Sequence, residues 1–531
     1  MKSVAFHNLG CKVNSYELDL MKENVLKNGW QIVPFDENAD VYIINTCSVT
    51  NIADRKSRQM IHRAKTLNPA AIVVAAGCYV QSDAFALSRD ESVDLLVGNN
   101  KKSQLSEILD EYLCARNAGT LSLYADRILG NAEGAPGKTE KQGETGITDK
   151  SETRDNMKLP NGDDISGSEK EVRIYLEKTL GNTTVLDLKN VSFEEGNIVK
   201  TDSHTRAYIK IQDGCDRYCS YCIIPYTRGN VRSKPIEEVV EEAEHLVGSG
   251  VREIVLTGIH VSSYGVDFAE YRKDAEAREE DARIVKTVAE IRERKSAISR
   301  KALLSLLEKL QEIKGLERIR LSSFEPLLIS EDFMKGLGRI SKICPHFHLS
   351  LQSGCDETLK RMNRRYTTAE YAEKVALIRS VFPDAAVTTD IIVGFPEETE
   401  KEFSETVSFA KEIGFYEIHV FKYSRRKGTP ADANPDQVPE QVKNTRSDTL
   451  LELTAKQSKD FRRRFRNREV EVLFEEEKEI AGRKYWLGHT REYVLVAIFS
   501  PENLENRIMK VETGDFIRDD VLLAHSSVSA L

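Results

Sequence analysis

Three cysteines stand close together in the segment IKIQDGCDRYCSYCIIPYTRGNVRS, residues 209–233. Cys215, Cys219 and Cys222 follow the spacing CxxxCxxC, and no fourth cysteine lies beside them. A structural zinc site takes four ligands in two pairs, so this set fits zinc poorly. A cubane iron–sulfur cluster held by three thiolates keeps its fourth iron open. The spacing therefore favours a cluster whose free iron can bind a substrate.

Three more cysteines follow short apolar runs near the N-terminus. The runs are residues 2–7, 40–45 and 71–76, and helical patterns separate them. This alternation predicts a doubly wound parallel sheet, whose working crevice lies beyond the carboxyl ends of its strands. Cys11, Cys47 and Cys78 come just after the three runs, so we expect them to point into one crevice. The alternative is chance placement of three small buried residues, but each lies next to Gly or a turn signal.

Composition limits the class of protein and its location. The chain has 531 residues, of which 40% are hydrophobic and 30% charged, which is enough for several globular domains. No signal peptide or membrane-length apolar stretch is recognisable, and nine cysteines without a secretory signal fit reduced thiols. We therefore expect a cytoplasmic protein with no membrane partner. The net charge of −9 argues against a general nucleic-acid binder, although a local basic patch can override that average.

A second alternating region spans residues 201–462. Its candidate strands are 207–212, 253–257, 317–322, 346–351, 387–392 and 418–423. Helical patterns separate most of them, which predicts a partial parallel (βα)6 barrel. Such barrels place their chemistry at the carboxyl ends of the strands, and the CxxxCxxC segment directly follows the first strand.

Two segments interrupt this organisation and divide the chain into domains. Residues 127–200 are rich in Gly, Ser, Lys and Glu, which predicts a low-complexity, loosely ordered insert after an N-terminal α/β domain at 1–126. Within the insert, residues 172–193 are a candidate hairpin. Residues 266–300 are charged helix formers and indicate a solvated helical insertion in the barrel.

The C-terminal segment, residues 463–531, alternates apolar and polar residues between Gly and Asn turns. This pattern predicts a small antiparallel β-barrel. Just before and within it lies the basic run FRRRFRN, residues 461–467, which offers phosphate contacts and aromatic stacking to RNA. The alternative is a helix end whose basic residues only face solvent.

The CxxxCxxC motif after a first barrel strand, with Tyr221 before the last cysteine, resembles the radical S-adenosylmethionine (SAM) enzymes. The resemblance implies that Cys215, Cys219 and Cys222 bind a 4Fe-4S cluster. Its open iron would chelate SAM, and one electron would split SAM into methionine and a 5′-deoxyadenosyl radical.

Turns at the strand ends should then seat the cofactor. Ser350, Gln352 and Asp390 are candidate polar contacts to SAM, and His260 in the turn TGIH is a further candidate. The competing interpretation is that a polar residue at a strand end only satisfies a backbone group.

The two three-cysteine sets together resemble the methylthiotransferases. The motifs include LGCKVNSYE (9–17), INTCSVTNIADRKSRQMIHRAK (44–65), AAGCYVQ (75–81), HLSLQSGCDETLKRMNRRYT (348–367), DIIVGFPEET (390–399) and FKYSRRKGTPA (421–431). They cover nearly all the chain outside the two inserts. The resemblance implies a second 4Fe-4S cluster on Cys11, Cys47 and Cys78 that holds or donates sulfur. It also implies that the last domain is an RNA-binding TRAM domain.

Within this family, CKVN (11–14), ADRKSRQMIHRAK (53–65) and LTGIH (256–260) resemble the threonylcarbamoyladenosine branch. The implied reaction converts C–H to C–S–CH3 at C2 of an adenosine beside the tRNA anticodon, with two SAM molecules consumed. An aromatic C–H lacks the acidity that general-base chemistry needs, whereas a carbon radical can attack it. The implied partners are the tRNA anticodon stem-loop and a reductant protein, and the sulfur donor stays open.

Four arginines are candidate contacts to the anionic substrate: Arg228, Arg232, Arg425 and Arg426. Surface ion pairs are the alternative role for these four side chains. Cys114, Cys344 and Cys355 fall outside both cysteine sets, and Cys355 is interpreted as a small buried thiol. The ten histidines show no metal-ligand pairing, although His346 and His348 share one strand face.

Other functions stay open at the level of sequence. The substrate could be N6-isopentenyladenosine in tRNA or an aspartate of a ribosomal protein. The chain could also be an RNA-binding iron–sulfur redox protein without thiolation activity. A radical methyltransferase that inserts no sulfur is disfavoured, because it would not need the N-terminal thiols.

Overall fold

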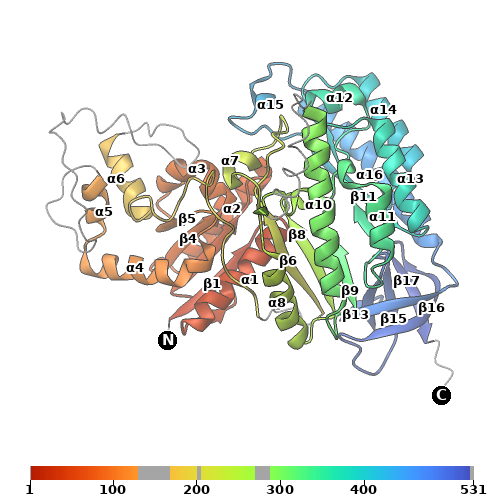
Figure 1. Ribbon diagram of the computed structural model, residues 1–531. Helices are drawn as coiled ribbons and strands as arrows, with labels where there is room; N and C mark the ends of the chain where they lie inside the picture. Colours follow the sequence, from red (N-terminus) through yellow and green to blue (C-terminus); the bar gives the residue numbers. More distant parts are fainter. Residues whose placement is uncertain (1, 129–167, 200–204, 270–287, 527–531) are drawn as a thin grey trace. The chain divides into compact units, whose positions relative to one another are not determined.

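The computed structural model describes residues 2–128, 168–199, 205–269 and 288–526 (Figure 1). The chain forms two compact units. The first comprises residues 1–198, 214–217 and 222–230, and the second comprises residues 199–213, 218–221 and 231–531. The division into four domains drawn from the sequence stays a prediction.

The N-terminal unit is built on a five-stranded parallel sheet with the order β2-β1-β3-β4-β5 (Figure 1). The strands are β1 (Ser3–Asn8), β2 (Gln31–Val33), β3 (Val41–Thr46), β4 (Ile72–Gly77) and β5 (Leu95–Val97). The connecting helices are α1 (Lys12–Lys27), α2 (Asn51–Leu67), α3 (Cys78–Ser88) and α4 (Leu105–Ala118). The predicted parallel α/β sheet is therefore confirmed, with three strands located to within one residue. The sequence missed β2 and β5, which have only three residues each.

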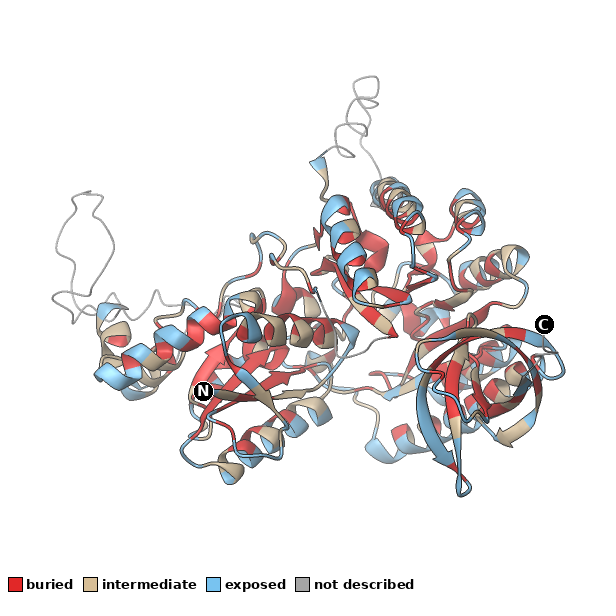
Figure 2. Cartoon of the chain, turned by 90° about the horizontal axis from the view of Figure 1, so that it is seen from below, coloured by how far each residue is buried: buried red, intermediate tan, exposed pale blue. Residues whose placement is uncertain are grey.

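The core of this unit lies on both faces of the sheet, whose strands are largely buried (Figure 2). Successive residues of β3 point to opposite faces. Tyr42 and Ile44 pack in one cluster with Ile61 of α2, whereas Val41 and Ile43 pack in the other with residues of α1 and α4. A strand buried on both faces reads as a continuous apolar run, which is why DVYIIN was recognisable.

Within the predicted 127–200 insert, residues 168–199 are packed, so the expected loose order is wrong for them, and it stays a prediction for the rest. Helix α5 (Ser122–Ile128) precedes residues 129–167, which lie outside the described residues, and α6 (Glu169–Lys178) follows them. Ser168 caps α6 through a capping box with Glu171, and Tyr175 and Leu176 are fully buried in the N-terminal core. The hairpin expected over 172–193 is also wrong. Its first part forms helix α6, because the capping box and the helical spacing of the apolar residues favour a helix.

The second unit contains a four-stranded sheet and a three-stranded parallel sheet. The first has the order β7-β6-β8-β9 and the second the order β10-β11-β12. The bounds are β6 (Arg206–Asp213), β7 (Arg232–Ser233), β8 (Glu253–Gly258), β9 (Arg318–Leu321), β10 (His346–His348), β11 (Ala386–Val393) and β12 (Glu417–Lys422). Strands β6, β8 and β9 are parallel, and β7 is antiparallel to β6. Isolated parallel bridges, Ile319 to Ile343 and Phe324 to Leu349, connect the two sheets.

Helices alternate with these strands, as predicted. The main ones are α8 (Ile236–Gly248), α10 (Val288–Gln311), α11 (Glu331–Gly338), α13 (Thr368–Val381), α14 (Glu400–Ile413) and α16 (Glu440–Arg463). The short ones near the strand ends are α7 (Ile224–Arg228), α12 (Asp356–Arg361) and α15 (Pro430–Ala433). Strand β10 ends earlier than predicted, and Leu349 and Gln352 beyond it form only isolated bridges. Of the predicted helical insertion at 266–300, residues 270–287 lie outside the described residues, and α10 begins within the remainder.

The five C-terminal strands close into a small barrel with the order β13-β14-β15-β17-β16 (Figure 1). They are β13 (Glu469–Ile480), β14 (Arg483–Thr490), β15 (Leu495–Ile498), β16 (Ile508–Arg518) and β17 (Val521–Ser526). All neighbouring pairs are antiparallel except β15 and β17. Closure removes the exposed strand edges that would otherwise favour aggregation.

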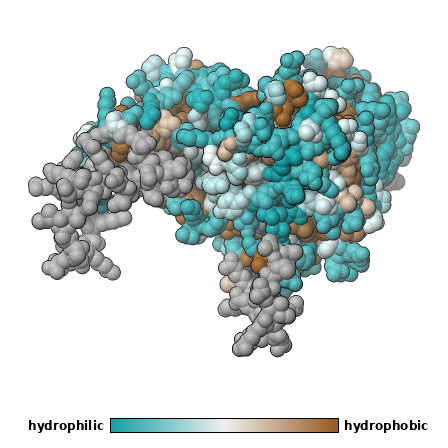
Figure 3. Space-filling view, turned by 90° about the horizontal axis from the view of Figure 1, so that it is seen from above, coloured by the Kyte–Doolittle hydropathy of each residue, from teal (hydrophilic) through white to brown (hydrophobic). Residues whose placement is uncertain are grey.

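The face of the molecule drawn in Figure 3 is mostly hydrophilic, with small scattered hydrophobic groups. Among the described residues, no helix combines the length and the apolarity needed to cross a bilayer.

Candidate cluster and cofactor sites

The N-terminal unit brings Cys11, Cys47 and Cys78 together at the carboxyl ends of its strands. Cys11 precedes α1, Cys47 follows β3, and Cys78 begins α3 after β4. Burial raises the pKa of Cys47 to about 12, and the nearby thiols of Cys78 and Cys11 act in the same direction. A metal reverses this preference for the thiol form, because a coordinating sulfur is deprotonated.

The absence of a side chain at Gly10 leaves room for the thiol of Cys47. Gly10 has φ +113°, and a Cβ built there would stand 2.9 Å from Cys47 Cβ and 3.0 Å from Cys47 Sγ. A side chain at this position would crowd the thiol and strain the backbone. The donor set of three neighbouring thiols and the missing Cβ both fit a three-thiolate iron–sulfur cluster.

A fully buried charge network lies beside the thiols. Arg228 Nη1 donates to Glu17 Oε1 at 2.7 Å, and Lys102 also pairs with Glu17. Arg228 opposes the burial that raises the pKa of Cys47. The sequence prediction that Arg228 contacts the substrate is therefore wrong, because its side chain has no exposed surface.

The sequence analysis did not predict the buried charges of Glu17 and Lys102, although the position of Glu17 in its helix could have indicated them. Glu17 lies on the buried face of α1 between Val13 and Met21, at helical spacing from both. A carboxylate on an apolar face needs a buried cation, and the arginine that supplies it is more than 200 residues away in sequence. Asn99 was also missed: its Nδ2 lies 3.6 Å from Cys78 Sγ, and an N–H···S contact tunes a bound cluster.

The CxxxCxxC segment forms the loop between β6 and α7, as predicted. Gly214 has φ +71°, and a Cβ there would lie 1.9 Å from the carbonyl oxygen of Asn230, so only glycine fits. The Cys215 N–H donates to the carbonyl oxygen of Gly229 at 3.0 Å, which anchors the start of the loop. Cys219 is buried, and Cys215 and Cys222 are partly exposed.

A line of polar contacts leads away from Cys219. Arg364 Nη1 lies 3.4 Å from Cys219 Sγ and 3.2 Å from Glu325 Oε1. Glu325 Oε2 lies 3.1 Å from His260 Nε2. The sequence suggested His260 but gave no role to Arg364 or Glu325, whose proximity depends on the tertiary fold.

The three predicted SAM contacts lie around the strand ends near this line. The backbone oxygen of Ser350 accepts from Tyr366 Oη at 2.8 Å. Gln352 has φ +71°, and its N–H donates to the Asp390 carbonyl oxygen at 2.8 Å, so Gln352 and Asp390 are neighbours. Burial alone would raise the pKa of Asp390, but His348, His419 and Arg364 outweigh it and lower the pKa.

The remaining predicted substrate arginines are held by the protein. Arg232 is 4% exposed and lies 3.5 Å from Asp213, which excludes an open substrate contact. Arg425 is exposed and pairs with Asp432 at 2.7 Å, and Arg426 is buried. The alternative of a surface ion pair is therefore correct for Arg425, whereas the pair of Arg232 with Asp213 is buried.

The basic run at 461–467 does not form the expected stacking surface. Phe461 and Phe465 are buried in a hydrophobic cluster that they share with residues of the C-terminal barrel strands. Arg464 pairs with Asp384 at 2.7 Å, and Arg463 pairs with Asp460 at 2.5 Å. Aromatic residues inside a core cannot stack on bases, so the predicted aromatic stacking is wrong.

Comparison with known families agrees with this arrangement. Residues 209–410, which contain the CxxxCxxC loop, most of β6 and strands β7 to β11, match the Radical SAM superfamily. Residues 3–98, which contain Cys11, Cys47 and Cys78, match a family described as Uncharacterized protein family UPF0004. The match identifies a radical SAM enzyme, with a 4Fe-4S cluster and SAM as cofactors.

Similar proteins identify the family within the radical SAM superfamily to which the chain belongs. The chain is 33% identical to threonylcarbamoyladenosine tRNA methylthiotransferase MtaB of Bacillus subtilis, over 100% of both chains. It is 30% identical to tRNA-2-methylthio-N(6)-dimethylallyladenosine synthase of Methylacidiphilum infernorum, over 96% of this chain and 92% of that one. The chain belongs to the radical SAM tRNA methylthiotransferase family, on the threonylcarbamoyladenosine branch.

Several solved structures align with most of the chain. The radical SAM methyltransferase TsrM from Kitasatospora setae aligns with a TM-score of 0.46 and 15% identity, over 81% of this chain and 77% of that one.

Proposed function

We propose that this enzyme methylthiolates C2 of N6-threonylcarbamoyladenosine next to the anticodon of tRNA. The observation that carries the proposal is the match to the Bacillus subtilis enzyme of that name over the full length of both chains. Both three-cysteine sets lie within the matched length. A tRNA substrate would also place the activity in the cytoplasm.

Cys215, Cys219 and Cys222 would hold the first cluster, and Ser350, Gln352 and Asp390 would contact SAM. When bound, this cluster supplies the electron that cleaves SAM to methionine and a 5′-deoxyadenosyl radical. Arg364 would position Cys219 and place a buried cation beside the cluster. Its 3.4 Å contact with the sulfur supports that role.

Cys11, Cys47 and Cys78 would hold the second cluster, which holds or donates the sulfur. Gly10 leaves room for the Cys47 thiol. Burial raises the pKa of Cys11 and Cys47, and the buried Arg228 guanidinium acts to lower it, which favours anionic sulfur there. Of two SAM molecules consumed per turnover, one would supply the methyl group and the other the radical. A reductant protein and a sulfur donor are further partners of this proposal.

The tRNA anticodon stem-loop would bind through the C-terminal barrel as a TRAM-like domain and reach a partial (βα)6 barrel made by β6 and β8 to β12. The closed five-stranded topology supports the first assignment, and the chain order of the six parallel strands supports the second. The run at 461–467 supplies no support, since its phenylalanines are buried.

A second candidate substrate is N6-isopentenyladenosine in tRNA. It is favoured by the 30% identity to the Methylacidiphilum infernorum enzyme over 96% of this chain. A ribosomal protein aspartate and a redox role without thiolation are the remaining alternatives.

Nucleoside mass spectrometry of tRNA from a strain lacking this chain separates the substrates. We expect the 2-methylthio derivative of N6-threonylcarbamoyladenosine to disappear, its unthiolated precursor to accumulate, and the wild-type chain to restore it. Loss of the 2-methylthio derivative of isopentenyladenosine instead would replace the first proposal by the second.

Anaerobic assay of the purified enzyme with SAM and a reductant tests the two cysteine sets. We expect Cys222→Ala to abolish 5′-deoxyadenosine formation, and Cys78→Ala to abolish thiolation while SAM cleavage continues. Cys114→Ala is the matched control, since this exposed cysteine lies outside both sets. A wild-type enzyme that binds clusters but forms no 5′-deoxyadenosine would be a redox protein.

A further inference from the structure

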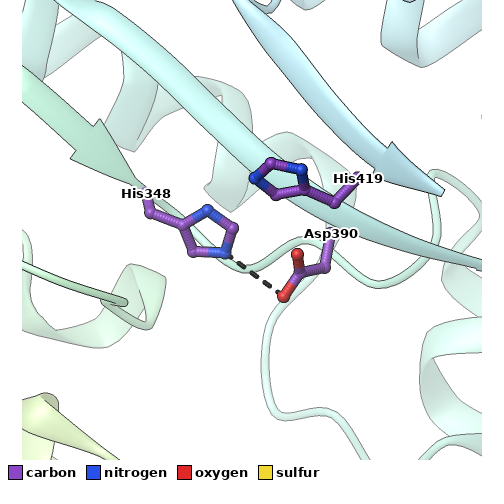
Figure 4. A group of neighbouring side chains, drawn as sticks. All are labelled: His348, Asp390 and His419. Carbon is purple, nitrogen blue, oxygen red and sulfur yellow. Dashed lines mark ion pairs between the residues drawn. The ribbon is translucent and has the colours of Figure 1, made fainter. Parts of the chain in front are cut away.

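Three potential metal ligands from adjacent strands meet on one face of the β10–β11–β12 sheet (Figure 4). They are His348 of β10, Asp390 of β11 and His419 of β12. In the sheet register, His348 pairs with Thr388 and Asp390 pairs with His419. Residues 388 and 390 share a face because strand side chains alternate. The parallel register therefore fixes all three side chains on that face.

The separations suit one shared ion. One ligand atom from each residue lies within 4.8 Å of the other two, and His348 Nε2 is 3.2 Å from Asp390 Oδ2. Two ligands bound at about 2.1 Å from one metal lie at most about 4.2 Å apart. Small side-chain rotations would bring the three ligand atoms within this separation. Among the described residues, this is the one group of three or more such ligands that lies this close.

His348 is also oriented as a metal-ligating histidine would be. Its Nδ1 lies 3.1 Å from Thr388 Oγ1, and metal-binding histidines normally hold their second nitrogen by such a hydrogen bond. With Nδ1–H donating to Thr388, the Nε2 lone pair faces the carboxylate of Asp390. Nε2 is buried, and no described residue gives it an aligned hydrogen bond. In this tautomer the lone pair faces an anion, so a cation between them would stabilise the pair, whereas in the other tautomer Nε2–H would donate to Asp390.

We propose that His348, Asp390 and His419 bind one divalent transition-metal cation, such as zinc or iron(II). Two imidazoles and one carboxylate are ligands that these ions prefer, and they leave coordination positions open for oxygen ligands. His419 is 45% exposed, so an ion can enter from solvent. The site contains no thiol, and it shares Asp390 with the proposed SAM contacts. The competing occupant of the gap is a proton on His348, which would make an ordinary ion pair.

Zinc binding to the reconstituted, full-length enzyme decides between a metal ion and a proton. The protein carrying both clusters is treated with chelator, desalted and dialysed against buffered zinc chloride at pH 7.5. Zinc and iron per chain are then measured by mass spectrometry. We expect one saturable zinc site in the wild type at unchanged iron content.

His419→Ala should weaken this zinc binding at least about 100-fold, since it removes a direct ligand. The substitution is safe for folding because the side chain is exposed, and His348→Ala should act in the same direction. His62→Ala is the matched control: His62 is also exposed and pairs with one carboxylate, Asp90, at 2.8 Å. Its zinc binding should equal that of the wild type.

Two results would overturn the proposal. One is a wild-type enzyme that binds no zinc beyond the level of His419→Ala. The other is that His419→Ala and His348→Ala bind zinc as tightly as the wild type does. That result would mean that the ion binds at another site. Neither result would bear on thiolation, which the tRNA measurements test separately.

Discussion

At the scale of single residues, charged side chains contact or neighbour the cysteine sulfurs inside the protein. Arg228 acts on the N-terminal thiols, and Arg364 contacts Cys219. Both arginines are buried and paired with a glutamate, Glu17 or Glu325. A buried cation beside a thiolate favours the anionic sulfur, and the paired glutamate fixes the guanidinium in place. These arginines are therefore positioning residues for the sulfurs.

Arg364→Gln should leave cluster assembly intact but make the cluster harder to reduce. The substitution removes a cation and an N–H···S contact 3.4 Å from Cys219, and both stabilise the more negative reduced state. For a one-electron couple, each 1.4 kcal/mol lost lowers the potential by about 60 mV. Redox titration followed by EPR measures the shift.

The control is Arg361→Gln, a nearby arginine that pairs with Glu402 at 2.9 Å. Its potential should match that of the wild type. An unchanged potential in Arg364→Gln would show that this guanidinium does not tune the cluster.

At the scale of elements, the loops after β1 and β6 depend on glycines that no other residue can replace. Gly10 and Gly214 both have positive φ, and a Cβ added to either would stand less than 3.0 Å from a neighbouring atom. They shape the turns on which Cys11 and Cys215 lie. Element geometry therefore sets the sulfur positions as much as cysteine spacing does.

Gly10→Ala should empty the N-terminal site while the CxxxCxxC site stays loaded. The added Cβ would push Cys47 away, because 2.9 Å is far inside contact distance. Iron analysis should fall from about eight to about four per chain. SAM cleavage should persist and thiolation should stop.

Gly29→Ala is the matched control for Gly10→Ala. It has the same backbone strain, with φ +80°, but nothing lies within 4 Å of the added Cβ. Full iron content in the control and loss in Gly10→Ala isolates crowding as the cause. Full iron in both variants would contradict the role of Gly10.

Helix α6 should stabilise the N-terminal unit as an ordinary core element. Tyr175 is fully buried, stacks edge-on against Phe85 at 5.8 Å, and donates to Asn182 at 2.7 Å. Tyr175→Ala should cost about 3–5 kcal/mol of unfolding free energy. Urea denaturation measures this. Lys170→Ala, at an exposed position of the same helix, should change stability by less than about 0.5 kcal/mol. If Tyr175→Ala had the same unfolding free energy as the wild type, α6 would not be a core element of the N-terminal unit.

At the scale of the whole molecule, the sequence predicted what depends on local pattern. Apolar runs located the long strands, and the spacing of Cys215, Cys219 and Cys222 located their loop. Short β2 and β5 were missed because three residues carry too little pattern. The Glu17–Arg228 pair and the His348–Asp390–His419 group were missed because only the fold brings such distant residues together. The run FRRRFRN gave a wrong prediction of base stacking, because a helix that buries its phenylalanines can have the same composition as an RNA-binding surface.

The second unit is held together by a buried charge cluster that should govern its acid stability. Glu253 accepts from Arg206 at 2.6 Å and from Arg320 at 2.9 Å, and Arg318 lies beside it. Arg206 also reaches Glu475, and Arg318 reaches Glu471, so the cluster links the parallel sheet to the C-terminal barrel. Burial alone would raise the pKa of Glu253, but the arginines outweigh it and hold the pKa far below its ordinary value of 4.5.

Glu253→Gln should therefore destabilise this unit by about 3 kcal/mol at pH 7, because it leaves buried arginines unpaired. A depressed folded-state pKa gives stability that is present above the unfolded pKa and lost as pH falls. The gap between wild type and variant should thus shrink by about 1.4 kcal/mol per pH unit below about pH 4.5. Urea denaturation at pH 7, 4.5 and 3.5 measures it. Glu469→Gln, which breaks an exposed pair with Lys510, should show a gap below about 1 kcal/mol throughout. A gap for Glu253→Gln that stays constant down to pH 3.5 would mean that its carboxylate is not held ionised by the arginines.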